Sequence, residues 1–333
     1  MGNNQTHQYL SLKSKILTLA PHSVIFPFYH AVSDHVGPHL KNLYRVQGIK
    51  DFEKSIDGLL YCMNPLSVED AITNFSKWSY GKPSFHLSFD DGLRETKDII
   101  APILLRKGIP ATFFITAGFT NNKILFHRHK ASLIVEKLKT SNSNIVETRI
   151  GSILNIPKVD HASLQKAIFS INFQTSHILD EIAEILDVDF TEFLNNEKPY
   201  FNASEIIDLD NNGFSIGLHS LNHPEFYLLN ESEMEYQVTE SQKLVNELTG
   251  IESKLFSYPF TDSGIPDHFI KKIIDKYKMT TFGTAGIKDE PTEGHFQRIP
   301  MEVWRSDSSI SLVANEIIRY RLKVIFGRQK VKR

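Results

Sequence analysis

The feature that most constrains the fold is a regular alternation of short apolar segments with amphipathic ones. Residues 84–119 hold an apolar run, a segment with apolar residues at helical spacing that closes at Gly108, and a second apolar run. This pattern predicts a strand, a helix and a strand. The alternation resumes near Asn202 and includes a long amphipathic segment at 225–249. Strands that alternate with helices favour a parallel α/β sheet, with the functional loops at the carboxyl ends of the strands.

The stretch between these two parts differs in pattern. Residues 123–199 carry helical periodicity without a convincing strand. A segment of this length is too long for a bare loop in a compact domain, so we expect a helical insertion that covers one edge. We therefore predict a single domain over residues 1–333, with its core at 22–122 and 200–305. Residues 306–333 are predicted to form a C-terminal amphipathic basic helix.

Composition narrows the range of functions. The chain has 37 Lys and Arg against 39 Asp and Glu, so it lacks the basic excess of a nucleic-acid-binding protein. Its single cysteine, Cys62, excludes an intramolecular disulfide and a zinc site built from several cysteines. No run of about 18 apolar residues occurs, and the N-terminus lacks the apolar stretch of a signal peptide. We therefore expect a cytoplasmic protein.

The C-terminal tail leaves two interpretations open. It ends in four basic residues, Arg328, Lys330, Lys332 and Arg333. A tail of this kind is usually solvated. The alternative is contact with an anionic surface, such as the inner face of a membrane.

Residues that can carry chemistry stand at the predicted strand ends. Asp90 and Asp91 end one apolar run directly before Gly92, where an Asp-Gly turn that caps the next helix would explain them structurally. His219 closes another apolar run, and His223 follows four residues later. Two histidines at this spacing are often incidental. Here, however, they end a strand of the same predicted sheet, so a carboxylate and two imidazoles can meet at one edge as a zinc-type ligand set.

Two segments of the chain resemble motifs of a known family. The first two motifs of the polysaccharide deacetylases, the NodB-homology carbohydrate esterases, are similar to SFDDG at 88–92 and HSLNHP at 219–224. The resemblance implies an irregular (β/α)7-type barrel with a divalent metal, most often zinc, held by Asp91, His219 and His223. It implies that Asp90 is the general base. The implied reaction is hydrolysis of the N-acetyl group of an amino sugar in a polysaccharide or glycan intermediate, a carbon–nitrogen bond other than a peptide bond, with release of acetate.

A third segment, FSYPF at residues 256–260, is similar to the substrate-groove motif of the family. Many members have an arginine that orients the catalytic carboxylate where this chain has Ser257. Arg298 is a candidate replacement because a bidentate guanidinium suits a carboxylate; a surface strand arginine is the alternative. The resemblance also implies that the backbone N–H of Tyr258 helps to bind the oxyanion.

The general acid needs a separate source. The C-terminal third lacks the Leu-x-His segment that supplies it in many members. Near the N-terminus an apolar run ends in Tyr29 and His30, as in a subset of deacetylases that deliver the acid histidine from that position. His30 is therefore the candidate acid. The alternative is a histidine that only fixes the strand end by hydrogen bonding.

Two other functions stay open at this point. The fold and the metal centre do not fix the leaving group, so the chain could hydrolyse a non-carbohydrate amide or an O-acetyl ester. A catalytically silent glycan-binding homologue is favoured by the missing motif arginine and the missing C-terminal histidine. The retained ligands and base favour the enzyme, with an N-acetylated carbohydrate as its partner.

Overall fold

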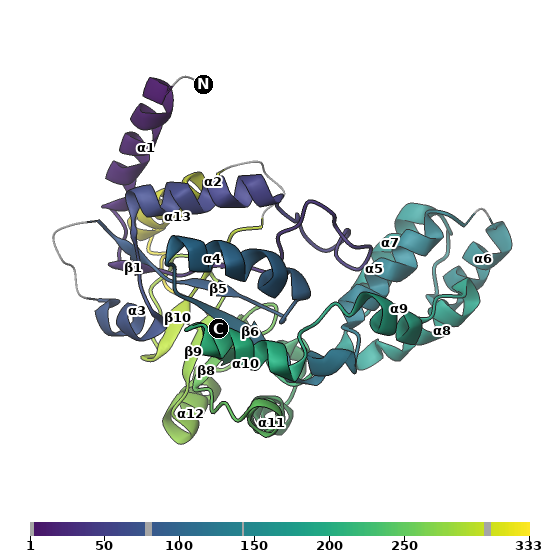
Figure 1. The fold of residues 1–333 in the computed structure, drawn as a ribbon. Helices are drawn as coiled ribbons and strands as arrows, with labels where there is room; N and C mark the ends of the chain where they lie inside the picture. Colours follow the sequence, from purple (N-terminus) through teal and green to yellow (C-terminus); the bar gives the residue numbers. More distant parts are fainter. Residues whose placement is uncertain (1–2, 77–81, 142, 303–307) are drawn as a thin grey trace.

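The computed structural model describes residues 3–76, 82–141, 143–302 and 308–333. At its centre lies a parallel sheet of eight short strands in the order β10-β9-β8-β7-β6-β5-β2-β11 (Figure 1). These strands are β2 (Pro27–Tyr29), β5 (Leu87–Phe89), β6 (Ala111–Ile115), β7 (Ser215–Leu218), β8 (Leu255–Ser257), β9 (Thr280–Gly283), β10 (His295–Gln297) and β11 (Ile299–Pro300). A second, small parallel sheet contains β1 (Val24–Ile25), β4 (Ser84–Phe85) and β3 (Asn64–Pro65).

One stretch of chain closes the large sheet. The edge strands β10 and β11 are separated in sequence by Arg298 alone. The first pairs with β9 and the second with β2, so residues 295–300 occupy both edges of the sheet. The sheet is thus a barrel with a seventh strand broken in two, and the predicted irregular (β/α)7-type barrel is confirmed.

Helices surround the barrel because its strands are apolar on their outer side as well. Phe89, Phe113 and Ile115 share one buried cluster with Phe52 of α2 and Leu104 of α4. The helices that cover the barrel are α2 (Ile49–Cys62), α3 (Val68–Asn74), α4 (Ala101–Lys107), α10 (Ala203–Asn211), α11 (Glu231–Thr249), α12 (Asp267–Tyr277) and α13 (Ser309–Ile325). The N-terminal helix α1 (Asn3–Leu17) packs on α2 and α13 and projects from the molecule (Figure 1). Short helical turns are η1 (Thr96–Ile100), η2 (Ala117–Asn122), η3 (Phe173–Thr175) and η4 (Phe226–Leu228).

A group of helices projects from one side of the barrel (Figure 1). It contains α5 (His127–Leu138), α6 (Asn144–Ile153), α7 (His161–Ser170), α8 (His177–Leu186) and α9 (Phe190–Glu197). Its first four helices contribute Ile134, Ile150, Leu164 and Ile182 to a hydrophobic cluster of their own. Within the described part of residues 123–199, all regular elements are helical.

The C-terminal segment differs from its prediction. The helix α13 ends at Ile325, and Gly327 then adopts a left-handed conformation at φ 63° that stops it. Beyond the turn, the backbone of residues 329–331 pairs with Asp289. The Arg333 side chain is only 2% exposed and forms ion pairs with acidic groups, so the expectation of a solvated tail is wrong for this residue. Residues 306 and 307 lie outside the described residues.

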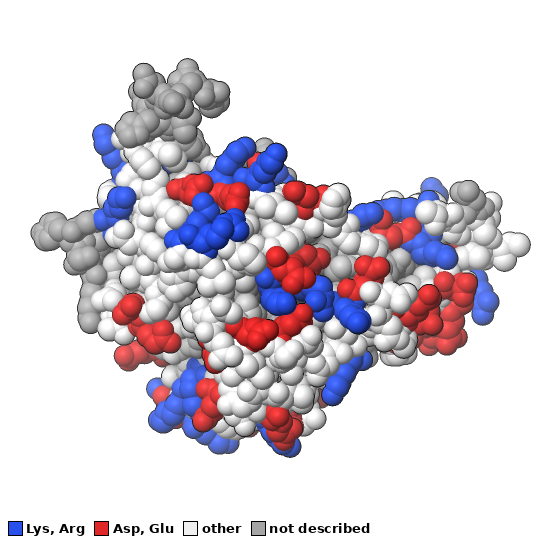
Figure 2. Space-filling view, in the orientation of Figure 1, with Lys and Arg blue, Asp and Glu red and all other residues white. Residues whose placement is uncertain are grey.

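The surface agrees with the balanced charge of the chain. Lys and Arg are intermixed with Asp and Glu over the face shown in Figure 2, without a large field of one sign. This face therefore lacks the basic stripe that is typical of a nucleic-acid interface. Among the described residues, no helix combines the length and the apolar character needed to cross a bilayer.

Candidate active site

The two adjacent aspartates lie at the carboxyl end of β5. Asp91 has φ 72° and Gly92 has φ 70°, so the chain makes a left-handed turn directly after Asp90. This backbone region is sparsely populated by residues other than glycine, and strain of this kind clusters at functional sites. Both carboxylates are buried, at 2% and 3% exposure. The turn gives these two neighbouring carboxylates different partners.

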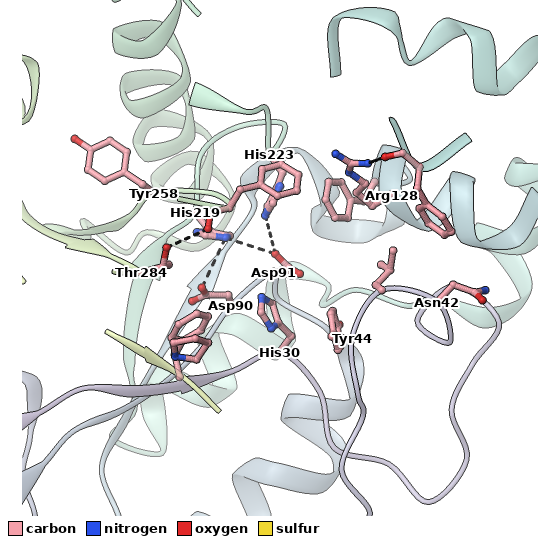
Figure 3. Close-up of a pocket in the computed structure, with 16 residues that line it drawn as sticks. His30, Asn42, Tyr44, Asp90, Asp91, Arg128, His219, His223, Tyr258 and Thr284 are labelled. Carbon is pink, nitrogen blue, oxygen red and sulfur yellow. Dashed lines mark hydrogen bonds and ion pairs between the residues drawn. The ribbon is translucent and has the colours of Figure 1, made fainter. Parts of the chain in front are cut away.

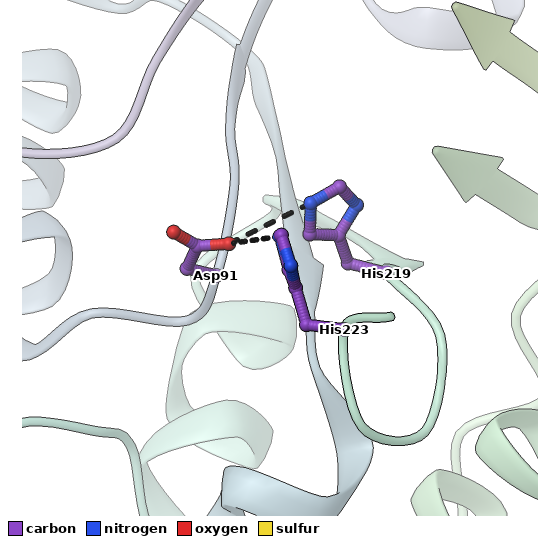
Figure 4. Close-up of side chains that lie close together, drawn as sticks. All are labelled: Asp91, His219 and His223. Carbon is purple, nitrogen blue, oxygen red and sulfur yellow. Dashed lines mark ion pairs between the residues drawn. The ribbon is translucent and has the colours of Figure 1, made fainter. Parts of the chain in front are cut away.

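Asp91 faces two histidines from the end of β7 (Figure 4). Its Oδ1 atom lies 3.1 Å from Nε2 of His223 and 3.6 Å from Nε2 of His219. One ligand atom from each residue lies within 4.8 Å of the other two. The structure therefore brings together the three residues predicted as metal ligands.

The chemistry of these three donors suits a cation. The Nδ1 atom of His219 donates to the Ser257 carbonyl at 2.8 Å, which leaves Nε2 as the lone-pair donor. Burial lowers the pKa of His219 to about 4, so this imidazole is neutral at pH 7. Burial alone would raise the pKa of Asp91, but His223 and the other nearby histidines lower it, and the carboxylate stays charged. Its Oδ1 atom is buried without a hydrogen-bond partner, as expected of an oxygen that binds a metal ion.

Asp90 is held by Arg298 in a bidentate ion pair. Both guanidinium nitrogens, Nη1 and Nη2, donate to the carboxylate at 2.7 Å. The arginine is 1% exposed, so the surface alternative does not describe it. Burial would raise the pKa of Asp90, but the Arg298 charge and hydrogen bonds lower it, which keeps the carboxylate ionised.

Ser257 completes this arrangement at the position where the family resemblance leads one to expect an arginine. Its hydroxyl contacts Nη2 of Arg298, and Ser88 accepts from Nη1 at 3.0 Å. The guanidinium also stacks over Phe28, 4.3 Å from the ring centre. Arg298 is the single residue between β10 and β11. The segment that closes the barrel therefore also supplies the guanidinium beside Asp90.

His30 lies on the same pocket and has a partner that the sequence reasoning missed. Its Nδ1 atom lies 2.6 Å from Oε2 of Glu302, and Oε1 of Glu302 accepts the Ala31 N–H at 2.8 Å. Burial lowers the pKa of His30, but the Glu302 carboxylate raises it more, to about 9. The signal for Glu302 lies in the register of β11 with β2, where Pro300 pairs with Phe28, so the next strand positions bring Glu302 beside His30.

Tyr258 does not fit its predicted role. Its side chain points away from the aspartates and histidines (Figure 3) and is fully buried in a cluster with α11 and α12. Its backbone N–H donates to the Phe282 carbonyl at 3.0 Å within the sheet. A donor that is already engaged in the ladder is not available to an oxyanion, so this prediction is corrected.

The pocket above these residues has a volume of about 590 Å³ (Figure 3). The loop after β2 supplies Asn42, Leu43 and Tyr44. Phe126 lies directly before α5, and the projecting helices α5 and α7 supply Arg128 and Phe169. Arg128 donates to Glu225 at 3.1 Å and to the Phe169 carbonyl. Glu225 also accepts the Phe173 N–H at 3.0 Å. It therefore links the loop that carries His219 and His223 to the projecting helices. Glu225 is a second residue that the sequence reasoning missed.

Comparison with known proteins identifies a matching family and solved structures with a similar fold. A family model described as polysaccharide deacetylase matches residues 78–146 and 172–281, more than half of the chain. The fold is similar to IcaB from Ammonifex degensii, with a TM-score of 0.55 and 13% identity over 90% of this chain and 98% of that one. It is also similar to the Streptococcus pyogenes deacetylase PplD in complex with acetate, with a TM-score of 0.52 and 12% identity over 87% and 97% of the two chains. No match was found among curated proteins.

Proposed function

The chain belongs to the polysaccharide deacetylase family, and from this premise we propose that it is a metal-dependent N-deacetylase of a glycan. The substrate is an amino sugar bearing an N-acetyl group, in a polysaccharide or a glycan intermediate. The products are acetate and the free amine. The observation that carries the proposal is the convergence of Asp91, His219 and His223 beside an Asp90 that Arg298 keeps charged.

The metal ligands are Asp91, His219 and His223, one carboxylate oxygen and two imidazole nitrogens. Zn²⁺ is the divalent ion that this ligand set suits best. A bound divalent cation would lower the pKa of water to about 7 and polarise the carbonyl oxygen of the acetamide. The burial of all three ligands supports a tight site, because it excludes competing water.

Proton transfer is divided between Asp90 and His30. Asp90 removes a proton from the attacking water, and Arg298 holds both of its oxygens so that the carboxylate is charged and oriented before the reaction. The C–N bond then breaks, and the amine nitrogen must take up a proton to leave. His30, kept as an imidazolium by Glu302, donates that proton. The two groups therefore act as base and acid at the same pH because their surroundings shift their pKa values in opposite directions.

The experiment measures acetate release from a chitooligosaccharide with the metal-loaded protein, with and without a chelator. We expect turnover to be lost after metal removal and restored by Zn²⁺. The Asp90→Asn variant should bind metal and lose turnover, whereas His219→Ala should lose metal affinity. Asp210→Asn, which changes an exposed aspartate of α10, is the matched control. Full turnover without metal, or full turnover of Asp90→Asn, contradicts the mechanism.

The same assay tests the bond class. An O-acetylated sugar and a non-carbohydrate acetamide are compared with the N-acetylated oligomer at equal concentration. Preference for the N-acetyl sugar supports the proposal, and preference for the ester or the simple amide rejects the assigned substrate. A protein that binds metal and glycan without turnover is the silent homologue.

A further inference from the structure

An apolar stripe lies exposed on the outer face of α13 and just beyond its end. Ile325 is 74% exposed and Phe326 is 71% exposed, and Leu322 and Ile318 are 51% and 43% exposed. Residues 318, 322, 325 and 326 follow the spacing i, i+4, i+7 and i+8, so their side chains gather on one side of the helix. Leu19, at 51% exposure, lies beside them, because its carbonyl accepts a hydrogen bond from Nε of Arg321.

Basic side chains border this stripe on both sides. At about 100° per residue, Arg321 falls next to one edge of the stripe, and Arg319 and Lys323 fall next to the other. Arg319 is paired with Glu316 at 2.7 Å. In the part of the chain that the structure describes, neither Arg321 nor Lys323 has a carboxylate within ion-pair distance, so an unpaired cation lies on each side of the stripe.

The occupant of this surface can be argued from its charge. A helix with an apolar stripe and flanking Lys and Arg is the arrangement that lies in the interface of an anionic lipid surface. A second copy of the chain fits less well, because a symmetric contact would bring the same cations together. A contiguous exposed apolar surface is also unusual in a monomer that has no partner for it.

We propose that the stripe formed by Ile318, Leu322, Ile325 and Phe326, with its basic border, docks this protein on an anionic lipid surface. The apolar side chains enter the headgroup boundary, and the lysines and arginines contact the lipid phosphates. This differs from a contact through the terminal residues, because Arg333 is buried in acidic partners. The inference does not depend on the proposed function.

The orientation that follows leaves the active site accessible. α13 begins beside the catalytic end of the barrel, where Ser309 contacts the Tyr29 hydroxyl at 2.9 Å. Its other end lies next to Leu19, which precedes the first strand, so the stripe is toward the opposite end of the barrel from the pocket. Docking through the stripe would therefore leave the pocket open to a glycan away from the lipid.

The test is co-sedimentation of the full chain with vesicles of phosphatidylcholine containing phosphatidylserine, and with vesicles of phosphatidylcholine alone. We expect binding to the anionic vesicles that weakens as salt is raised. The Ile325→Ser/Phe326→Ser variant should bind at least tenfold more weakly, and so should Arg321→Glu/Lys323→Glu. Ile145→Ser, which changes an isoleucine of α6 that is 83% exposed outside the stripe, is the matched control and should bind as the wild type does.

Three outcomes overturn the inference. These are no binding of the wild type, equal binding to the two kinds of vesicle, and unchanged binding of both double variants. Sedimentation without lipid tests the competing occupant, since a dimer that the serine variant converts to a monomer would assign the stripe to a second copy. Because Ile325 and Phe326 are exposed, thermal unfolding of the serine variant should match the wild type. All altered side chains lie outside the catalytic machinery, so acetate release should be unchanged in both variants and the result is read independently of the proposed deacetylase activity.

Discussion

At the residue scale, the guanidinium that orients Asp90 comes from a different strand than the family resemblance leads one to expect. The position after Phe256, where the family resemblance leads one to expect an arginine, holds Ser257, and the guanidinium beside Asp90 comes from Arg298. The side chains of Ser257 and Arg298 are in contact, so the small serine leaves space for the large arginine. The charge near Asp90 is preserved although its origin in the sequence is 208 residues away.

Arg298→Lys tests whether the paired geometry matters beyond the charge. A lysine keeps the positive charge near Asp90 but cannot make two parallel hydrogen bonds. We expect kcat to fall by about 10- to 100-fold, which corresponds to about 1.4 to 2.7 kcal/mol, with unchanged metal affinity. Steady-state kinetics and metal titration measure the two quantities. Wild-type kcat in this variant would show that the bidentate contact has no catalytic role.

Glu302→Gln tests the carboxylate behind His30. Glu302 raises the pKa of His30 to about 9, so the imidazolium persists at neutral pH and is lost as the pH rises through that value. A glutamine keeps a hydrogen bond without the charge, so the pKa of His30 should fall. We therefore expect the alkaline limb of the pH profile of kcat/KM to move to lower pH, by about one unit or more.

The control for this experiment is Glu316→Gln, a glutamate of α13 that pairs with Arg319 away from the pocket. Its pH profile should match that of the wild type. An alkaline limb that stays in place in Glu302→Gln would remove Glu302 as the positioning residue of His30. A limb that persists in His30→Ala would remove His30 as the acid.

At the element scale, the sequence predicts secondary structure correctly where a segment has clear apolar periodicity of its own. The βαβ unit at residues 84–119 and the helical character of residues 123–199 follow from apolar spacing. The predicted helix at 225–249 is shorter, because Asn230 caps α11 and the chain before it forms a separate turn. Asp91, His219 and His223 could be proposed as a group because motifs at strand ends carry them.

Pairings that depend on barrel closure could not be predicted in this way. β11 has two residues, too few for any periodicity, and its position beside β2 is set by the whole sheet. Glu302 is placed by that pairing alone. The error at Tyr258 has the same origin, since only the register of β8 with β9 determines that its N–H bonds to Phe282.

The projecting helices contribute a wall of the pocket, which Phe169→Ala tests. Phe169 lines the cavity, and its carbonyl accepts from Arg128, which Glu225 holds. Loss of an aromatic contact in the pocket should raise KM for an N-acetylated oligomer by about 3- to 10-fold, with little change in kcat. An acetylated monosaccharide should be less affected.

The matched control is Phe193→Ala, because Phe193 is an aromatic residue of α9 that packs against His39 in the loop after β2 and does not line this pocket. We expect this variant to lose stability and to keep the wild-type KM, so the kinetics are compared at a temperature where both variants are folded. A KM that is unchanged for every substrate in Phe169→Ala would exclude the helices from substrate binding through this residue.

At the scale of the whole molecule, the N-terminal helix and the C-terminal segment both pack against the rest of the protein. α13 packs in the same cluster as α1 and α2, and after it the chain returns to a buried group of acids. Arg333 donates to Asp262 at 2.8 Å and to Glu290 at 2.6 Å. The composition of the tail suggested solvent, but the tertiary position of these carboxylates determines that its last cation is buried.

Arg333→Gln should therefore destabilise the protein more than its place in the sequence suggests. Removing one partner leaves buried carboxylates without their cation, which costs about 3 to 5 kcal/mol of unfolding free energy. Lys332→Gln, at an exposed neighbouring position, should change it by less than about 0.5 kcal/mol. Urea denaturation measures both.

The effect of Arg333→Gln should also depend on pH in a defined direction. Burial would raise the pKa of Asp262, but His295 and hydrogen bonds hold it below its ordinary value, so this carboxylate is charged at neutral pH. Its interaction with Arg333 therefore contributes stability above the ordinary carboxyl range and loses it as the pH falls. We expect the difference between wild type and variant to be largest near pH 7 and to shrink only in strong acid, as the pH falls through the lowered pKa of Asp262, below the ordinary carboxyl pKa of about 4. A difference that is constant with pH would mean that Arg333 stabilises the tail by packing rather than by its charge.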